Sequence, residues 1–332
     1  MIAVFGSGFG LYGHVPALVE LGRDVCVSVR YRSAFDERAE LTAYRSAVHF
    51  VVDDASLLSK ADLAVLVRRP ADNDALARQA MLIRCPPQLV IEKPPAPTPQ
   101  AALLLDSALR AAGVRRSTPY LLAHCDWARD CQRRVTSGRV GEITLDWHFN
   151  SQYTSGSWKA APEEGGGPLS YYFIHVIALA EFFLGDYHVV ECWATEEGFD
   201  RKIGMVAVNR SIRFTATFCA STDSVFSIAL NGVVAMTAAT PFGAIPRRGD
   251  RDPRIDTLKR FYTTEVFISS KAAHQRAEDR GRRVLEVWAE LAERLRRENA
   301  ACHWGDGERG FRSTDGERFK RVRARMSIVH EK

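Results

Sequence analysis

Residues 2–14 read Ile-Ala-Val-Phe-Gly-Ser-Gly-Phe-Gly-Leu-Tyr-Gly-His. Four apolar residues lead directly into a glycine-rich turn, the pattern of a buried strand followed by a turn that opens a helix. In dinucleotide-binding folds the first glycine permits the bend, and the second lets the backbone approach a pyrophosphate. Gly6 and Gly8 fit these roles, while Leu11 stands at the third glycine position. We predict that the dinucleotide is held by residues of this turn: Gly6, Ser7, Gly8, Phe9 and Gly10.

Apolar runs alternate with amphipathic stretches over the first 125 residues. Helical periodicity is present over residues 15–21, 71–83 and 99–112. Between these stretches we predict strands at residues 2–5, 25–29, 49–52, 63–67, 89–91 and 120–123. Repetition of strand, helix and strand predicts the α/β class, with an N-terminal Rossmann domain built on a doubly wound parallel sheet over residues 1–123.

The pattern changes in residues 124–332, for which we predict an α+β domain that binds substrate. Strand-like runs occur at residues 143–150, 189–194, 205–208, 212–218, 224–230 and 233–237, with a helix at residues 169–184. Asn231-Gly232 is a strong hairpin signal between the last two strands, so the sheet should be mostly antiparallel. A late helix carries one apolar stripe that we assign to the core: Val284, Leu285, Trp288, Leu291 and Leu295.

The end of the second predicted strand bears on the choice between NAD and NADP. A carboxylate at this position would hold the ribose hydroxyls of NAD. The chain has Ser-Val-Arg-Tyr-Arg-Ser at residues 28–33 instead. Arg30, Arg32 and Ser33 suit a 2′-phosphate, so we predict that NADP is preferred over NAD. The alternative is a solvated arginine pair. Arg68, after the fourth strand, either reaches the same phosphate or ribose or lies on the surface.

Two further motifs supply residues that suit acid–base chemistry. Glu92-Lys93-Pro94 ends the fifth predicted strand, at the edge of the sheet where ligands bind. Downstream, the run Gly165-Gly166-Gly167 precedes a predicted helix, and we expect its backbone to pass close to a ligand. Tyr171 and His175 are four residues apart on this helix and therefore share one side of it. A lone helical histidine more often packs in a core, but the glycine run ahead of this helix favours a site residue.

Composition and charge argue against several other classes of function. The net charge is +5, and the basic run at residues 318–325 is typical of a solvated face, so we expect no nucleic-acid partner. The seven cysteines form no CxxC pair, which predicts no metal site. Apolar runs are too short for a membrane span, and no leader precedes the first strand, so we expect a cytoplasmic protein.

Taken together, these motifs resemble those of the Gfo/Idh/MocA oxidoreductases. The matching segments are residues 6–10 with 14–18, Glu92-Lys93-Pro94, residues 137–143 and residues 165–175. The resemblance implies a C-terminal domain with an open sheet, often the oligomer interface, and hence a homo-oligomer. It also implies a small carbohydrate-type substrate, Lys93 as the catalytic lysine and His175 as the catalytic histidine. Glu92 and Lys93 would also lie beside the cofactor.

The chain departs from this family at positions around the histidine. The family usually has Asp at the position of Tyr171, Gly at that of Phe173 and an acidic residue at that of Ala178. Tyr171 is therefore a candidate proton donor or substrate contact, but it cannot act as a carboxylate that raises the basicity of His175. Further substrate candidates are Trp158 and Lys159, for which surface packing is the alternative. Weaker ones are Asn150 and Tyr153, and Arg247-Arg248 for a phosphate.

The sequence thus predicts an NADP-dependent oxidoreductase that moves a hydride between the nicotinamide and a hydroxyl/keto carbon of a sugar, cyclitol or nucleotide-linked sugar. Lys93 would hold the oxygen, and His175, with or without Tyr171, would move the proton. Two alternatives remain. One is redox-neutral glycoside cleavage, in which a retained cofactor transiently oxidises the sugar. The other is a non-catalytic dinucleotide-binding partner or sensor.

Overall fold

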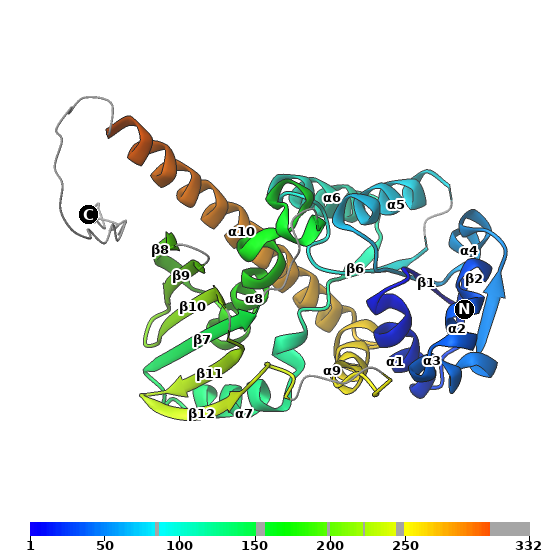
Figure 1. Cartoon of the computed structure of the whole chain (residues 1–332), viewed down its shortest axis with the longest axis horizontal. Helices are drawn as coiled ribbons and strands as arrows, with labels where there is room; N and C mark the ends of the chain where they lie inside the picture. Colours follow the sequence, from blue (N-terminus) through cyan, green and yellow to red (C-terminus); the bar gives the residue numbers. More distant parts are fainter. Residues whose placement is uncertain (84–85, 151–156, 198–199, 222, 244–248, 306–332) are drawn as a thin grey trace.

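The structure, a computed structural model, consists of two units, each built on a six-stranded sheet (Figure 1). It describes residues 1–83, 86–150, 157–197, 200–221, 223–243 and 249–305. The first unit holds the N-terminal part of the chain up to β6 (Arg115–Ser117), and the second holds most of the remainder.

The first sheet is parallel throughout, with the strand order β3-β2-β1-β4-β5-β6. This is the order of a doubly wound dinucleotide-binding fold, so the predicted Rossmann architecture is confirmed. The carboxyl end of β1 lies next to that of β4, at the point where the strand order reverses. The strands are β1 (Ile2–Phe5), β2 (Val25–Ser28), β3 (Val48–Val51), β4 (Leu63–Leu66), β5 (Gln88–Ile91) and β6 (Arg115–Ser117).

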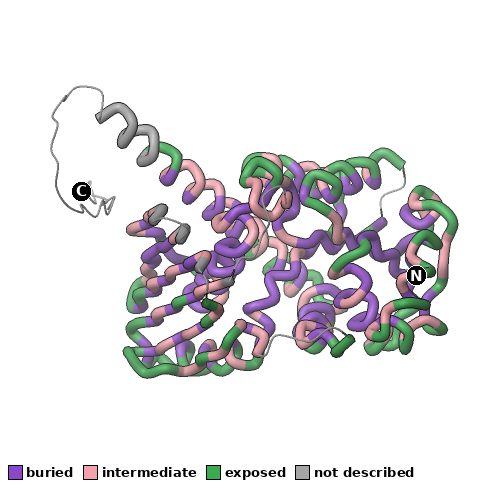
Figure 2. Tube along the Cα trace, viewed as in Figure 1, coloured by how far each residue is buried: buried purple, intermediate pink, exposed green. Residues whose placement is uncertain are grey.

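Alternate residues of these strands pack into two separate cores, one on each face of the sheet. Val4 and Val65 face one core together with residues of α1, whereas Phe5 and Leu66 face the other with residues of α4, α5 and α6. Figure 2 shows the strands buried and the outer turns of α5 exposed. The helices are α1 (Val15–Glu20), α2 (Arg32–Glu37), α3 (Ala39–Thr42), α4 (Asp54–Lys60), α5 (Pro70–Leu82) and α6 (Pro99–Ala111).

The prediction of a sixth strand at residues 120–123 is wrong. The sixth strand is β6, and residues Leu121–His124 form a 3₁₀ turn. β6 has only three residues, two of them arginines, so it carries no apolar pattern that identifies a strand. Buried Arg116 is tolerated there because Glu278 pairs with it at 3.1 Å and Asp106 accepts from its Nε.

The second sheet has the strand order β12-β11-β7-β10-β9-β8 and is antiparallel except between β7 and β10. The predicted mostly antiparallel sheet is thus confirmed. Asn231 and Gly232 form the β11–β12 turn with positive φ, as the hairpin signal predicts. The strands are β7 (Glu142–Asn150), β8 (His188–Glu197), β9 (Asp200–Val208), β10 (Arg213–Ser221), β11 (Val225–Leu230) and β12 (Val233–Ala238).

Three helices contribute to the core of this second sheet: α7 (Asp126–Thr136), α8 (Ile174–Leu184) and α10 (Lys271–Gly305). The apolar stripe predicted on the late helix is buried, with Trp288 fully enclosed. Because α10 is long, it reaches both units and contacts α6 and β6 as well as α8 and β8 (Figure 1). The helix therefore braces the two units against each other.

One helical stretch is long and apolar enough to cross a membrane by length and composition alone. Pro162–Leu184 spans 23 residues with a mean hydropathy of 1.4 over its best window, and 72% of that window is buried inside the structure. The core helix of a globular unit passes the same test, and α8 packs in such a core.

Residues far along the chain return to complete the core of the first unit. α9 (Arg254–Phe261) and the π-helical turn Tyr262–Val266 pack with β1, β2 and α1. Phe261 and Tyr262 are fully buried there. The core of the first unit thus includes a segment that follows the second sheet in sequence, an arrangement that no local pattern indicates.

We expect Phe261→Ala to destabilise the protein by about 3–5 kcal/mol, because the large buried ring would leave a cavity. Urea unfolding followed by circular dichroism measures the loss. Phe242→Ala, at a half-buried position, is the control and should cost less. Equal losses in the two variants would contradict the assignment of Phe261 to the core.

Candidate functional site

A cavity of about 1180 Å³ lies between the two sheets and contains most of the predicted site. It is lined by residues of both units, so neither unit forms it alone. The predicted residues that it brings together are Gly6, Ser7, Gly8, Phe9, Arg30, Arg68, Glu92, Lys93, Trp158, Lys159, Tyr171 and His175. Three predicted cofactor residues do not line it: Gly10, Arg32 and Ser33.

The glycine turn at the carboxyl end of β1 has the geometry that the sequence predicts. Gly6 has φ +146°, and a Cβ atom there would lie 2.0 Å from the carbonyl oxygen of Val67, so only glycine fits. A Cβ on Gly8 would meet nothing within 4 Å, which leaves its backbone open toward the cavity. This open backbone fits the phosphates of a dinucleotide. Gly10 instead packs beneath the turn, where a Cβ would lie 3.3 Å from Val67.

The arginines that follow β2 are less free than the sequence suggests. Arg30 donates to Asp54 at 3.1 Å and to the Tyr31 hydroxyl at 2.9 Å, and Arg68 also donates to Asp54. Arg32 stacks over the ring of Phe50 at 4.6 Å, away from the cavity. Asp54, which no pattern singled out, therefore already offsets part of the positive charge beside the cavity.

Lys93 lies at the carboxyl end of β5 in a largely enclosed position. Its Nζ donates to the backbone carbonyl of Tyr171 at 2.7 Å and lies 3.9 Å from the centroid of the Tyr171 ring. Burial lowers the pKa of Lys93 to about 7; the charges of Arg254 and Lys159 act in the same direction, and Glu92 opposes them. The amine is thus able to exchange a proton near neutral pH.

Glu92 belongs to a buried hydrogen-bonded chain that fixes the backbone next to Lys93. One oxygen accepts from the backbone N–H of Lys93 at 3.1 Å, and the other lies 3.0 Å from Nε2 of His14. Nδ1 of His14 lies 2.7 Å from the hydroxyl of Tyr262. His14 and Tyr262, which sequence reasoning did not assign to the site, hold Glu92 in place. Glu92 lines the cavity, but both of its carboxylate oxygens contact other groups of the protein.

Tyr171 and His175 face the same cavity, as their spacing predicts, from the π-helical turn Pro168–Phe173 and from α8. Lys93 meets the ring face and the carbonyl of Tyr171, and Trp158 packs edge-on against the ring at 5.4 Å. Burial raises the pKa of Tyr171 and lowers that of His175, which the charges of Lys93 and Arg254 lower further. Nδ1 of His175 is buried without a hydrogen-bond partner among the residues that the structure describes, so none of their carboxylates supports this nitrogen.

The glycine run 165–167 has a different role from the predicted one, because none of its members lines the cavity. A Cβ on Gly165 would lie 2.8 Å from Pro70, and one on Gly166 would lie 2.2 Å from the carbonyl oxygen of Trp158. The small residues let this loop pack closely against protein. They thereby position Trp158 and Lys159, which do line the cavity.

Arg254, at the start of α9, is a cavity residue that the sequence analysis missed. Its guanidinium stacks over the ring of Phe9 at 4.0 Å. Asp252 accepts hydrogen bonds from its Nε at 2.9 Å and from Nη2 at 2.6 Å. The short Asp252-Pro253-Arg254 run could have indicated the contact between Asp252 and Arg254. The contact with Phe9, 245 residues away in sequence, depends on the fold.

Four weaker candidates cannot be placed. Tyr153, Arg247 and Arg248 lie outside the described residues, and the side chain of Asn150 is outside them as well. Within the described part of the chain, no group of three or more His, Cys, Asp or Glu side chains is arranged to hold a metal ion.

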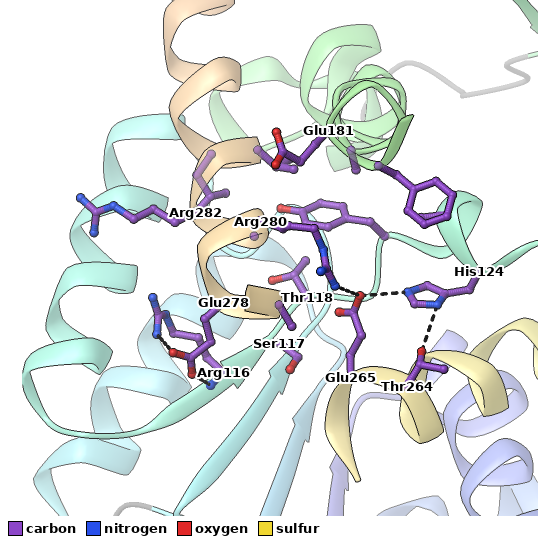
Figure 3. Close-up of a pocket in the computed structure, with 18 of the residues that line it drawn as sticks. Arg116, Ser117, Thr118, His124, Glu181, Thr264, Glu265, Glu278, Arg280 and Arg282 are labelled. Carbon is purple, nitrogen blue, oxygen red and sulfur yellow. Dashed lines mark hydrogen bonds and ion pairs between the residues drawn. The ribbon is translucent and has the colours of Figure 1, made fainter. Parts of the chain in front are cut away.

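A second cavity, of about 410 Å³, lies beyond β6 among α7, α8 and α10 (Figure 3). Its charged side chains largely pair with one another. Glu265 contacts His124 at 3.5 Å and Arg280 at 3.0 Å, and Arg116 pairs with Glu278. The pairs of Arg280 with Glu265 and of Glu278 with Arg116 join α10 to the first unit, so we interpret them as structural.

Comparisons with known proteins identify the fold. No protein-family model matches the chain, and no curated protein matches it. Among solved structures, the WlbA (WbpB) dehydrogenase of Thermus thermophilus, in complex with NAD and UDP-GlcNAcA, is 14% identical with a TM-score of 0.61, covering 87% of this chain and 94% of that one. The myo-inositol dehydrogenase of Lactobacillus casei, in complex with NAD(H) and myo-inositol, is 13% identical with a TM-score of 0.63, covering 90% and 94%.

The chain has the fold of the Gfo/Idh/MocA dehydrogenases. The same fold is present in a super-repressor mutant of Gal80p from Saccharomyces cerevisiae, which is 9% identical with a TM-score of 0.63 over 91% of this chain and 96% of that one. At such low identities the comparison establishes architecture, and activity has to be argued from the side chains in the cavity.

Gly8→Asp should weaken dinucleotide binding while the protein stays folded. The new side chain meets no protein atom at Cβ but places a carboxylate where phosphates would bind, so we expect affinity to fall at least about tenfold. Fluorescence titration with NADPH and NADH measures this. Gly281→Asp, at a glycine of α10 where a Cβ would also meet nothing within 4 Å, controls for the added charge. Undiminished binding by Gly8→Asp would exclude the turn as the phosphate site.

Proposed function

We propose that the protein is an NAD(P)-dependent oxidoreductase acting on a CH–OH group of a sugar, a cyclitol or a nucleotide-linked sugar. The observation that carries this proposal is the position of Lys93: a partly enclosed amine with a pKa of about 7 faces the same cavity as His175 and the glycine turn. The solved dehydrogenases with this fold, in complex with NAD and UDP-GlcNAcA or with myo-inositol, support the substrate class.

The residues of the cavity fit a nicotinamide dinucleotide. Gly8 leaves backbone open at the carboxyl end of β1, and Arg30 and Arg68 lie on the side where the ribose phosphate of NADP would be held. When bound, the cofactor would accept a hydride from the carbinol carbon or return one to the carbonyl carbon.

Lys93 is the residue we assign to proton exchange. A neutral Lys93 amine accepts the hydroxyl proton as the alcohol becomes a ketone, and the ammonium returns that proton in the reverse direction. Glu92 fixes the backbone of Lys93, and the Tyr171 carbonyl holds its Nζ at 2.7 Å. His175, whose pKa is lowered by burial, remains neutral and is suited to bind the substrate oxygen. Lys93 thus takes the proton-transfer role for which the sequence analysis favoured His175.

We further propose that NADP is preferred over NAD, through Arg30 and Arg68. The solved relatives named above are NAD or NAD(H) complexes, and Asp54 already binds both guanidiniums. A 2′-phosphate would have to compete with Asp54 for the two guanidiniums or bind them together with it. The preference should therefore be smaller than two unpaired arginines would give.

Replacing Lys93 by Met should lower turnover at least about 100-fold while cofactor affinity is largely retained, because the proton-exchanging group is lost but the phosphate-binding turn is not. Steady-state kinetics together with NADPH titration measures both quantities. Tyr171→Phe is the matched control: Lys93 meets the ring face and the carbonyl, so removing the hydroxyl should change turnover only a few-fold. Full activity of Lys93→Met would contradict the assignment of proton exchange to Lys93.

The pH dependence should have opposite signs in the two directions. Oxidation needs the neutral amine of Lys93, so kcat/KM for the alcohol should rise with pH and level off above about 7. Reduction needs the ammonium, so kcat/KM for the ketone should fall as pH increases through the same value. Profiles measured in both directions test this, and identical slopes would contradict the assignment.

Arg30→Gln should weaken binding of NADPH about tenfold and leave NADH nearly unchanged, because a charge-assisted hydrogen bond to the 2′-phosphate is lost. Parallel fluorescence titrations of both cofactors provide the measurement. Arg32→Gln, on the neighbouring side chain that stacks over Phe50, is the matched control. Wild-type protein that binds NADH as tightly as NADPH would refute the NADP preference.

A further inference from the structure

Three cationic side chains gather at the Lys93 end of the cavity. They come from three separate parts of the chain: Lys93 follows β5, Lys159 lies in the turn Trp158–Ala160, and Arg254 opens α9. The Nζ atoms of Lys93 and Lys159 lie 3.9 Å and 5.4 Å from the centroid of the Tyr171 ring. The proposed proton exchange uses Lys93 alone and assigns no role to Lys159 or Arg254.

The carboxylates near this end either make hydrogen bonds within the protein or are exposed to solvent. The described residues that line the cavity include Asp72, Glu92 and Asp252. Glu92 is bound by His14 and by the backbone N–H of Lys93, and Asp252 is bound by Arg254. Asp72 is exposed in the first turn of α5. Glu92 and Asp252 are thus engaged within the protein, and the positive charges of Arg254 and Lys159 repel each other across this end of the cavity.

Arg254 is held in a fixed position beside the cavity. Buried Asp252 accepts from its backbone N–H at 2.8 Å as well as from its side chain. The ring of Phe9 supports the guanidinium plane at 4.0 Å. A side chain fixed in this way loses little conformational entropy when it binds an anion.

Aromatic walls strengthen the effect of these charges. Trp147, Phe149, Trp158, Tyr171 and Phe242 line the same cavity, and an apolar lining strengthens electrostatic interactions within it. Burial lowers the pKa of Lys159, and the charge of Arg254 lowers it further. An anion bound between Lys159 and Arg254 would relieve this repulsion.

We propose that the substrate carries a negatively charged group, a carboxylate or a phosphate, that Lys159 and Arg254 bind while the reacting carbon faces Lys93. This inference rests on the proposed function and narrows it from sugars and cyclitols in general to their acidic or phosphorylated derivatives. Lys159 and Arg254 then determine substrate specificity, and Lys93 keeps its assigned role in proton exchange.

The test compares three probes that share a sugar ring and differ at C6: glucose, glucuronate and glucose 6-phosphate. Isothermal titration calorimetry of the full chain, with and without saturating NADPH, gives the affinity for each. We expect each anionic probe whose charged group fits to bind at least tenfold more tightly than glucose. The carboxylate and phosphate arms distinguish the two sources of charge.

Variants then identify the side chains responsible. Lys159→Gln and Arg254→Met should each weaken the anionic probe about tenfold and leave glucose and NADPH unchanged. Arg210→Met removes a charge from the exposed bend between β9 and β10, and serves as the matched control. Lys159 is half-buried and lies outside the Asp252–Arg254 ion pair, so its variant tests the anion contact even if Arg254→Met fails to fold.

Three results would overturn the inference. One is equal affinity of the wild-type protein for charged and neutral probes, or no binding of either anionic probe. Another is equal weakening of all three probes in both variants. A third is loss of NADPH affinity in Arg254→Met with anion selectivity intact, which would assign Arg254 to the cofactor. Each leaves the proposed function standing, whereas failure of the wild-type protein to bind NADPH or NADH refutes the proposed function itself.

Discussion

The buried carboxylate of Glu92 is the interaction on which the arrangement of the site depends. It connects the end of β5 to His14 beside α1, and through His14 to Tyr262 in the segment that follows α9. Nε2 of His14 lies 3.0 Å from a Glu92 oxygen and Nδ1 lies 2.7 Å from the Tyr262 hydroxyl, so each imidazole nitrogen has a hydrogen-bonding partner. Glu92, His14 and Tyr262 each have a hydrogen-bonding partner in this buried network, which avoids the free-energy cost of an unpaired buried polar group.

This constraint links catalysis to the architecture of the whole molecule. Tyr262 arrives with the segment that completes the core of the first unit, so the backbone beside Lys93 is fixed by residues nearly 170 positions away. The same segment brings Arg254 to Phe9. The second unit contributes Tyr171, whose carbonyl holds the lysine amine. Lys93 thus lies where three parts of the chain meet.

The enclosed cations and the unsupported histidine set the chemistry available to the cavity. Neighbouring positive charges and burial favour the neutral forms of Lys93 and His175. Because no carboxylate of the described residues bonds to Nδ1 of His175, that imidazole lacks the support that would make it a stronger base. These features underlie our proposals that the lysine exchanges the proton and that Lys159 and Arg254 bind an anionic ligand.

The sequence by itself determined the Rossmann unit, the mostly antiparallel second sheet, and the cavity positions of Lys93, Tyr171 and His175, because strand-end position and helical spacing are local. It did not reveal β6, whose three polar residues carry no apolar period, or the pairing of Asp54 with Arg30 and Arg68. Only the tertiary structure decided the packing role of the glycine run, the chain from Glu92 to Tyr262, and the place of Arg254. Those contacts join residues far apart in sequence, and their energies depend on burial that no local pattern encodes.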